Sequence, residues 1–210
     1  MCLYRAQPLK NNCQSWLAAC PRASHKAFMK THRFDITGPV LFVPKKHEDS
    51  RGAFMETFRR DIFAQATGCN DPFVQDNRSV SENAGTLRGL HAQTPPRAQG
   101  KLISVVAGAI FDVATDIRKA SPTFGRSVSL KLSPDNGAQF WIPPGFLHGF
   151  VTLAPRTIVS YKCTDYYSAD HEITIAWNDP VLAIDWATDA PVLSAKDASA
   201  RSFANFNSPF

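Results

Sequence analysis

The 210-residue sequence lacks several features that would place it in large classes of protein. No uninterrupted apolar run approaches the roughly 18 residues that a membrane-spanning helix needs. Charged residues make up only 20% of the chain, which is too few for a disordered protein, and 44% of the residues are hydrophobic, which is enough for a core. No internal repeat or low-complexity linker divides the chain. We therefore expect one soluble globular domain without membrane contact.

Acidic residues are absent from the first 28 positions, and this absence accounts for the basic character of the chain. The net charge is +5 and the isoelectric point is about 9.0. Arg5, Lys10, Arg22 and Lys26 provide most of the excess of 23 basic over 18 acidic residues. The remaining sequence has no basic run and no nucleic-acid-binding motif. The charge therefore predicts no nucleic-acid partner.

Residues 1–28 are interpreted as an N-terminal extension, either disordered or created by a start site placed upstream of a true start at Met29. Leu17-Ala18-Ala19 is too short for the apolar region of a signal peptide. A basic, acid-free stretch also fits an organelle-targeting segment, and N-terminal sequencing of the native protein separates these interpretations. The predicted domain spans residues 29–200, and residues 201–210 are expected to form a C-terminal tail.

The cysteines form no recognisable disulfide framework. Cys2, Cys13 and Cys20 lie in the extension, which leaves Cys69 and Cys163 in the predicted domain. Neither belongs to a CxxC pair. A reducing, cytoplasmic location is therefore expected.

Short alternating stretches separated by Gly, Pro, Asn and Asp dominate the chain from Val40 onward, and they predict antiparallel β-structure. Two strands are expected within residues 102–117, around Ala107-Gly108. Further strands are expected at residues 128–132, 139–142 and 158–163. Helices are predicted only at residues 61–67, where Gly68 is the stop signal, and after Ser194. The absence of alternating strands and helices predicts an all-β fold, with a jelly roll as the first choice.

The second strand within residues 102–117 has two faces of different character. Phe111, Val113, Thr115 and Ile117 share one face, whereas Asp112 and Asp116 share the other.

Two of the six histidines have unusual neighbours. His91 follows Arg88-Gly89-Leu90, and the spacing Pro143-x-Gly145-x-x-His148 matches the second half of the cupin signature. The first half of that signature requires His-x-His, but His91 is followed by Ala92 and Gln93, so three metal ligands cannot be assembled. We therefore predict a cupin-like jelly-roll barrel without a metal or other cofactor. The alternative is that both histidines are structural residues near loops.

Acid–base chemistry by side chains remains as the route to catalysis. Histidine titrates near neutral pH and can take a proton from an activated carbon. Lys101, ten residues after His91, offers a cation for an enolate oxygen. Tyr161 can return a proton, because a phenol with a reference pKa of about 10 stays protonated at neutral pH. Any barrel has inward-facing lysines and tyrosines, so these residues alone define no reaction.

The order of motifs along the chain resembles that of the dTDP-4-dehydrorhamnose 3,5-epimerase family, from about Met29 to Asp197. Many motifs in one order are far more specific than any one of them. The matching segments are Asp49-Ser50-Arg51-Gly52-Ala53-Phe54-Met55-Glu56, Phe73-Val74-Gln75-Asp76-Asn77, Leu87-Arg88-Gly89-Leu90-His91, Gln99-Gly100-Lys101-Leu102, Asp116-Ile117-Arg118, Ser121-Pro122-Thr123-Phe124-Gly125, Trp141-Ile142-Pro143, His148-Gly149-Phe150, Tyr161-Lys162-Cys163-Thr164-Asp165-Tyr166-Tyr167 and Trp177-Asn178-Asp179-Pro180.

The resemblance implies an isomerase that inverts C3 and C5 of dTDP-4-dehydro-6-deoxy-D-glucose in dTDP-L-rhamnose biosynthesis. It implies His91 as the base, Asp197 as the partner of that base, Tyr161 as the proton donor and Lys101 as the stabiliser of the enolate. The alternative for Asp197 is a surface position on a helix.

Binding roles are implied in the same way. Tyr167 matches the aromatic residue that stacks on the thymine, and the other positions match residues that contact the nucleotide sugar. The implied set is Arg51, Glu56, Gln75, Asn77, Arg88, His148, Tyr167, Glu172 and Lys196. Family sites are completed across a homodimer interface, so Arg51 and Glu56 are expected to act on a partner subunit.

Ala92 departs from the family pattern, in which an aromatic residue follows the motif histidine. A wider pocket beside the base would favour a narrower activity, epimerisation at C3 or C5 alone. Two further alternatives are a metal-dependent cupin oxygenase or isomerase, which elemental analysis tests, and a non-catalytic sugar-nucleotide-binding barrel. Retention of His91, Lys101, Tyr161 and Asp197 together argues against the last.

Overall fold

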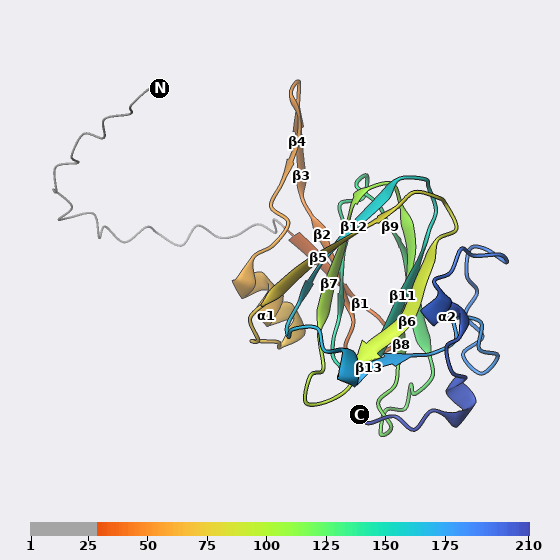
Figure 1. The fold of residues 1–210 in the computed structure, drawn as a ribbon. Coiled ribbons are helices and arrows are strands. Elements are labelled where there is room, and N and C mark those ends of the chain that lie inside the picture. The colour runs from red at the N-terminus through yellow and green to blue at the C-terminus, as the bar shows by residue number, and fades with distance from the viewer. Residues whose placement is uncertain (1–28) are drawn as a thin grey trace, which may run out of the picture.

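The computed structural model describes residues 29–210, and the predicted extension, residues 1–28, lies outside the described residues. Two antiparallel sheets face each other and form a barrel (Figure 1). The six-stranded sheet has the order β1-β2-β10-β7-β12-β5, and the five-stranded sheet has the order β13-β6-β11-β8-β9. This is the predicted all-β, cupin-like jelly roll.

The strands of the six-stranded sheet are β1 (Met29–Arg33), β2 (Val40–Pro44), β5 (Gln75–Ser81), β7 (Lys101–Ala107), β10 (Gln139–Ile142) and β12 (Thr157–Cys163). Those of the five-stranded sheet are β6 (Leu87–Gln93), β8 (Ile110–Asp116), β9 (Ser127–Leu132), β11 (Phe146–Thr152) and β13 (Glu172–Thr174). A separate hairpin consists of β3 (Lys46–Asp49) and β4 (Gly52–Met55), and it projects away from the barrel (Figure 1). Helices are α1 (Arg60–Thr67) and α2 (Ala195–Ala198), with short 3₁₀ turns at Ala169–His171 and Phe203–Asn205.

Both predicted helices are present. Helix α1 ends at Gly68, which adopts a left-handed conformation with φ of 72° and donates its N–H to the Ala64 carbonyl. Helix α2 begins after Ser194, whose side chain accepts a hydrogen bond from the backbone N–H of Asp197. None of the helices among the described residues is long and apolar enough to cross a membrane.

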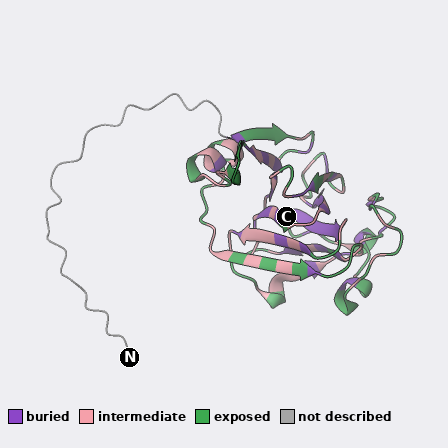
Figure 2. Ribbon diagram, turned by 90° about the horizontal axis from the view of Figure 1, so that it is seen from above, coloured by how far each residue is buried: buried purple, intermediate pink, exposed green. Residues whose placement is uncertain are grey.

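Alternation along the strands divides the apolar side chains into layers. The first core cluster lies between the sheets and includes Ile103, Phe140 and Phe150. A cluster around Trp141 and Phe63 fills the space between the six-stranded sheet and α1. In β5 the residues alternate between half-buried and exposed, as the alternating colours of this strand in Figure 2 show, and this is the period of two of a β-strand.

A further core cluster covers the outer face of the five-stranded sheet, where the C-terminal segment packs against it. Phe203 in this segment is 5% exposed, and Ser208 donates a hydrogen bond to the Ile117 carbonyl. Residues 201–210, set apart by the sequence as a tail, therefore belong to the packed structure. This cover lies on the apolar face of β8, which includes Val113 and continues to Ile117. Asp112 and Asp116 lie on the other face of the strand, which they share with Ile110 and Ala114 of the core between the sheets, and both are also buried.

Candidate active site

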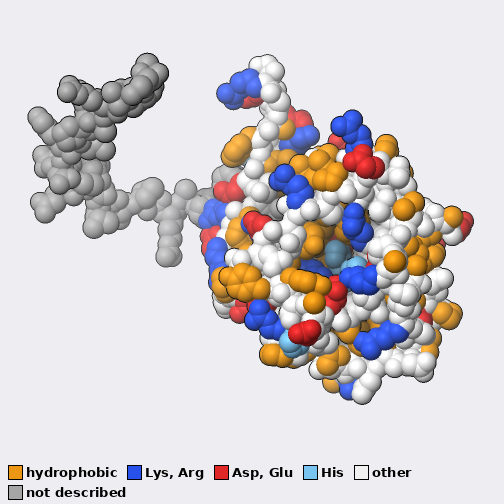
Figure 3. Space-filling model, viewed as in Figure 1, with side chains coloured by type: hydrophobic (Ala, Val, Ile, Leu, Met, Phe, Trp, Pro, Cys, Tyr) orange, Lys and Arg blue, Asp and Glu red, His pale blue; other side chains and the backbone are white. Residues whose placement is uncertain are grey.

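A cavity of about 540 Å³ opens between the two sheets. In the space-filling view, histidine side chains lie in a hollow near the middle of the face, with Lys and Arg side chains around it (Figure 3). A smaller cavity of about 270 Å³ shares part of the same lining. Most of the sequence-predicted site residues border one or both cavities: Gln75, Asn77, Arg88, His91, Lys101, His148, Tyr161, Tyr167, Glu172, Lys196 and Asp197.

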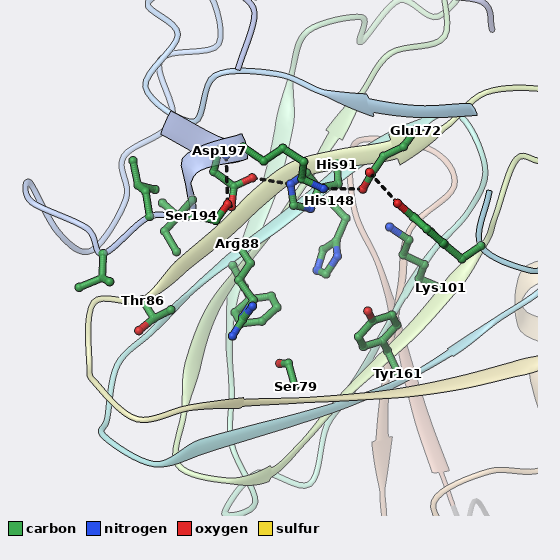
Figure 4. Close-up of a pocket in the computed structure, with 16 residues that line it drawn as sticks. Ser79, Thr86, Arg88, His91, Lys101, His148, Tyr161, Glu172, Ser194 and Asp197 are labelled. Atoms are coloured by element: carbon green, nitrogen blue, oxygen red, sulfur yellow. Dashed lines mark hydrogen bonds and ion pairs between the residues drawn. The ribbon is translucent and has the colours of Figure 1, made fainter. Parts of the chain in front are cut away.

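The two sheets provide opposite walls of this cavity. His91 on β6 and His148 on β11 are directly paired across the five-stranded sheet. Lys101 on β7 and Tyr161 on β12 belong to neighbouring strands of the six-stranded sheet. Figure 4 shows the Tyr161 ring and the His91 ring on different sides of the cavity. An acid and a base therefore stand on opposite sides of any group bound between the sheets.

Glycines bring the two histidine-bearing strands close together. Gly89 has a φ of 135°, and a Cβ added to it would lie 2.5 Å from the Cα of Gly149 on β11. No other residue fits such a contact with the neighbouring backbone. The register between these strands shifts between His148 and Phe150, and this irregularity lies beside the paired histidines.

His91 is joined to the buried Asp197. Their Nε2 and Oδ1 atoms are 2.6 Å apart, and the ring N–H donates because an ionised carboxylate only accepts. Burial opposes the charge of Asp197, but hydrogen bonds from His91 and Ser194 and nearby positive charge outweigh it, so the pKa of Asp197 is lowered. With only 4% exposure, Asp197 is not the surface helix residue that the sequence left as an alternative.

A second histidine–aspartate pair lies beside the first. His148 Nε2 and Asp112 Oδ1 are also 2.6 Å apart, and the Asp112 side chain is fully buried. The other carboxylate oxygen of Asp112 has no hydrogen-bond partner. Sequence reasoning placed Asp112 on a polar strand face without assigning it a role. An aspartate in a strand of the core needs a hydrogen-bond partner, and this need is a signal that the sequence contains. The strand register that makes His148 this partner cannot be read from the sequence.

Burial shapes the ionisation of the opposite wall. It lowers the pKa of Lys101, although the charges of Cys163, Glu172 and Asp112 act in the other direction. Burial also raises the pKa of the Tyr161 phenol, which keeps this group protonated at neutral pH. The thiol of Cys163 has a raised pKa for the same reason, opposed by the charge of Lys101. A lysine whose charged form is disfavoured by burial and a neutral proton donor thus lie on the same wall.

A polar network forms the rim of the cavity. Lys196 Nζ donates to Glu172 Oε1 over 2.8 Å, and the Tyr167 hydroxyl donates to Glu172 Oε2 over 3.1 Å. The Tyr167 N–H also donates to Gln75 Oε1, and the Gln75 amide donates to Asn77 Oδ1. These contacts hold the exposed ring of Tyr167 beside the flexible side chain of Lys196. Such an arrangement suits a nucleobase stacked on the ring and a phosphate group bound by the lysine.

Arg51 and Glu56 are the two predicted site residues that do not reach the cavity. Arg51 lies at the turn of the β3–β4 hairpin, has a side-chain exposure of 88% and pairs with Asp49. Glu56 follows β4, and its Oε1 atom lies 3.8 Å from Nε of Arg59. Both are displaced from the cavity of their own subunit, so the sequence-based prediction that they serve a partner subunit stays a prediction.

Ala92 lies mainly in the outer core. It follows His91 along β6, is 6% exposed and belongs to the cluster under the C-terminal segment, although it also borders the smaller cavity. Among the described residues, no group of His, Cys, Asp and Glu is arranged to hold a metal ion. Cys69 and Cys163 are free thiols.

Comparisons with known proteins agree with the motif order. A family model described as dTDP-4-dehydrorhamnose 3,5-epimerase matches residues 33–205. The dTDP-4-dehydrorhamnose 3,5-epimerase of Pseudomonas aeruginosa is 48% identical over 178 residues, covering 84% of this chain and 97% of that protein. The crystal structure of dTDP-6-deoxy-D-glucose-3,5-epimerase from Legionella pneumophila in complex with dTDP-4-keto-L-rhamnose has a TM-score of 0.81 and 46% identity, covering 85% of this chain and 95% of that one. A 3'-monoepimerase from Streptomyces bikiniensis in complex with dTDP-quinovose has a TM-score of 0.78 and 34% identity, covering 82% and 87%.

Proposed function

Because this chain belongs to the dTDP-4-dehydrorhamnose 3,5-epimerase family, we propose that it inverts both C3 and C5 of dTDP-4-dehydro-6-deoxy-D-glucose. The product is dTDP-4-dehydro-L-rhamnose, an intermediate of dTDP-L-rhamnose biosynthesis. The observation that supports this activity best is the placement of His91 and Tyr161 on opposite walls of one cavity. Inversion needs a proton removed from one face of the sugar and returned to the other.

The proposed reaction begins with His91. The C4 ketone acidifies the protons on C3 and C5, and His91 takes one of them while the electron pair moves to the C4 oxygen. Asp197 stabilises the imidazolium that forms, because its carboxylate accepts the hydrogen bond from Nε2. Lys101, kept inside the cavity, supports the enolate charge.

Tyr161 completes the inversion by protonating the carbon from the other wall. This step leaves a tyrosinate and an imidazolium, and proton exchange with solvent restores both before the second carbon reacts. Arg88 and Lys196 are proposed to bind the diphosphate, Tyr167 to stack on the thymine, and Gln75, Asn77, His148 and Glu172 to hold the remaining polar groups of the nucleotide sugar.

Proton NMR of the substrate with the enzyme in deuterated water tests this function. Deuterium is expected at both C3 and C5, since Tyr161 takes up a deuteron from the solvent before it protonates each carbon. His91→Ala is the matched control and should incorporate none at a comparable rate. Incorporation at one carbon alone would make the chain a monoepimerase and Ala92 the first residue to examine. No exchange at either carbon would overturn the proposal.

A homodimer in the cytoplasm is proposed as the working state. The β3–β4 hairpin carries Arg51 and the 71%-exposed Phe54 away from its own barrel, where a partner could receive them. Free thiols at Cys69 and Cys163 fit a reducing compartment.

Mixed dimers test whether Arg51 acts on the partner. Arg51→Ala and His91→Ala subunits, each inactive alone, are refolded together. If Arg51 serves the other subunit, each mixed dimer has one intact site, and about a quarter of wild-type activity returns for random pairing. If it serves its own subunit, no activity returns. Sedimentation analysis of the same samples measures the dimer directly.

A further inference from the structure

The segment that forms the C-terminal wall of the cavity is fixed at both ends. At its start, Val192 forms an isolated parallel bridge with Thr86, and its carbonyl accepts the Leu87 N–H over 3.0 Å. At its end, Arg201 forms a second parallel bridge with Ile175. Helix α2 lies between these attachments, beside β6 (Figure 1). These two attachments hold the segment that carries α2 beside the strand of His91.

Ser194 makes two hydrogen bonds to Asp197. Its Oγ accepts the Asp197 N–H over 3.1 Å, and its hydroxyl donates to Asp197 Oδ2 over 2.9 Å. The other carboxylate oxygen, Oδ1, receives His91. Each oxygen of the carboxylate thus has its own partner, and the two together fix the plane of the group (Figure 4). At 4% exposure, Asp197 has little access to water that could replace the hydroxyl.

We propose that Ser194 is a positioning residue for the base, acting through Asp197. This inference rests on the proposed role of His91. A carboxylate bonded only to His91 can turn about its last torsion, and the imidazole then turns with it. Catalytic groups must be held within about 0.5 Å and 10–20° of the productive geometry. The Ser194 hydroxyl removes this freedom, so the unprotonated nitrogen of His91 keeps one direction towards the substrate.

Ser202 provides a matched control in the same part of the chain. It also caps a short helical turn, accepting the Ala204 N–H, and its hydroxyl donates to a buried carboxylate, Asp179 Oδ2, over 2.7 Å. Neither Ser202 nor Asp179 borders the catalytic cavity. Replacing either serine removes the same chemical groups, but only Ser194 is connected to His91.

The experiment compares Ser194→Ala, Ser194→Gly, Ser194→Thr and Ser202→Ala by steady-state kinetics and by deuterium exchange at C3 and C5. Ser194→Ala is expected to lower kcat about tenfold with little change in KM, because misplacement of the base affects the reaction more than binding. Its pH profile of kcat should shift, since the hydrogen bond to Asp197 is gone. Glycine is tolerated at the N-cap of a helix, so Ser194→Gly should keep α2 but show the same loss of kcat. Ser194→Thr supplies a hydroxyl again and should restore most of kcat.

Ser202→Ala should keep the wild-type kcat while its Tm falls. Wild-type kcat in Ser194→Gly, or an equal kcat loss in Ser202→Ala, would overturn the inference while leaving the proposed function intact. A wild-type enzyme that exchanges neither carbon would instead overturn the proposed function, and the inference with it.

Discussion

Two histidine–aspartate pairs lie side by side in one barrel with the same 2.6 Å separation, yet their surroundings differ. The His91 side chain is 22% exposed, whereas that of His148 is 9% exposed. Asp197 comes from a C-terminal helix, and both of its oxygens have partners. Asp112 comes from a neighbouring strand of the same sheet, and one of its oxygens has none.

The difference shows that a short hydrogen bond does not by itself define a catalytic pair. The first pair combines access to the cavity with a carboxylate that is held from two sides. In the second pair His148 also borders the cavity, but its aspartate is fully enclosed, and the charge of Asp112 acts on its surroundings, including the pKa of Lys101. We expect chemistry to depend on the first pair and the stability and electrostatics of the cavity to depend on the second.

Removing the base should produce the largest effect. His91→Ala is expected to lower epimerisation at least about 100-fold, the usual contribution of a general acid–base residue. Tyr161→Phe should show a loss of similar size on the opposite wall. Deuterium exchange at C3 and C5 measures both, and near-normal turnover by His91→Ala would remove the central claim.

Removing the charge of Asp197, the partner of the base, should produce the second-largest loss of turnover. Asp197→Asn keeps the shape of the side chain but removes the charge that supports the imidazolium, so kcat should fall roughly 10- to 100-fold. The KM should change less than kcat, because Asp197 contacts the base and not the sugar. Stopped-time NMR assays at saturating substrate provide the measurement, and a pure KM effect would contradict this role.

The alkaline limb of the pH profile should report Lys101. Because burial lowers its pKa below the ordinary 10.5, Lys101 loses its proton as pH rises through that lower value, and kcat should fall about tenfold per pH unit above it. Folding stability changes in the opposite direction. The unfolded chain binds this proton more readily, so the protein gains stability as pH rises between the lowered pKa and 10.5. Lys101→Gln should lose both dependences, as paired activity and urea-unfolding series would show.

The second pair should give the smallest change in turnover. Asp112→Asn is expected to lower kcat less than about tenfold but to lower the free energy of unfolding by about 1–3 kcal/mol, because a buried hydrogen-bonded partner is altered. Urea unfolding alongside kinetics separates the two effects. A loss of turnover as large as that of Asp197→Asn would place His148 and Asp112 in the chemical step and remove the distinction between the pairs.

Much of the fold could be predicted from local patterns. The period of two gave the strands around Ala107-Gly108, and Gly68 gave the end of α1, because both signals act within a few residues. Burial of the outer face of β8 was not predictable in this way. It depends on Phe203 and its neighbours returning to the sheet from far along the chain.

The site followed a similar division. Family resemblance supplied His91, Tyr161 and Asp197, and the structure brings them to one cavity. The contact between His148 and Asp112 depends on strand register, which composition and spacing do not reveal. Ser194 was recognised only as a possible helix start, since its contact with the carboxylate appears only when α2 is placed beside β6.

The partner of the base follows every strand in the sequence, and this order has a consequence for synthesis of the protein. A nascent chain that has completed β13 contains His91, Lys101 and Tyr161, but it has neither Asp197 nor the cover over the outer sheet. Until the last segment leaves the ribosome, the molecule is a barrel with an exposed apolar face and an unsupported base. Chaperone contact should therefore be concentrated in this brief interval, and catalysis should begin when it ends.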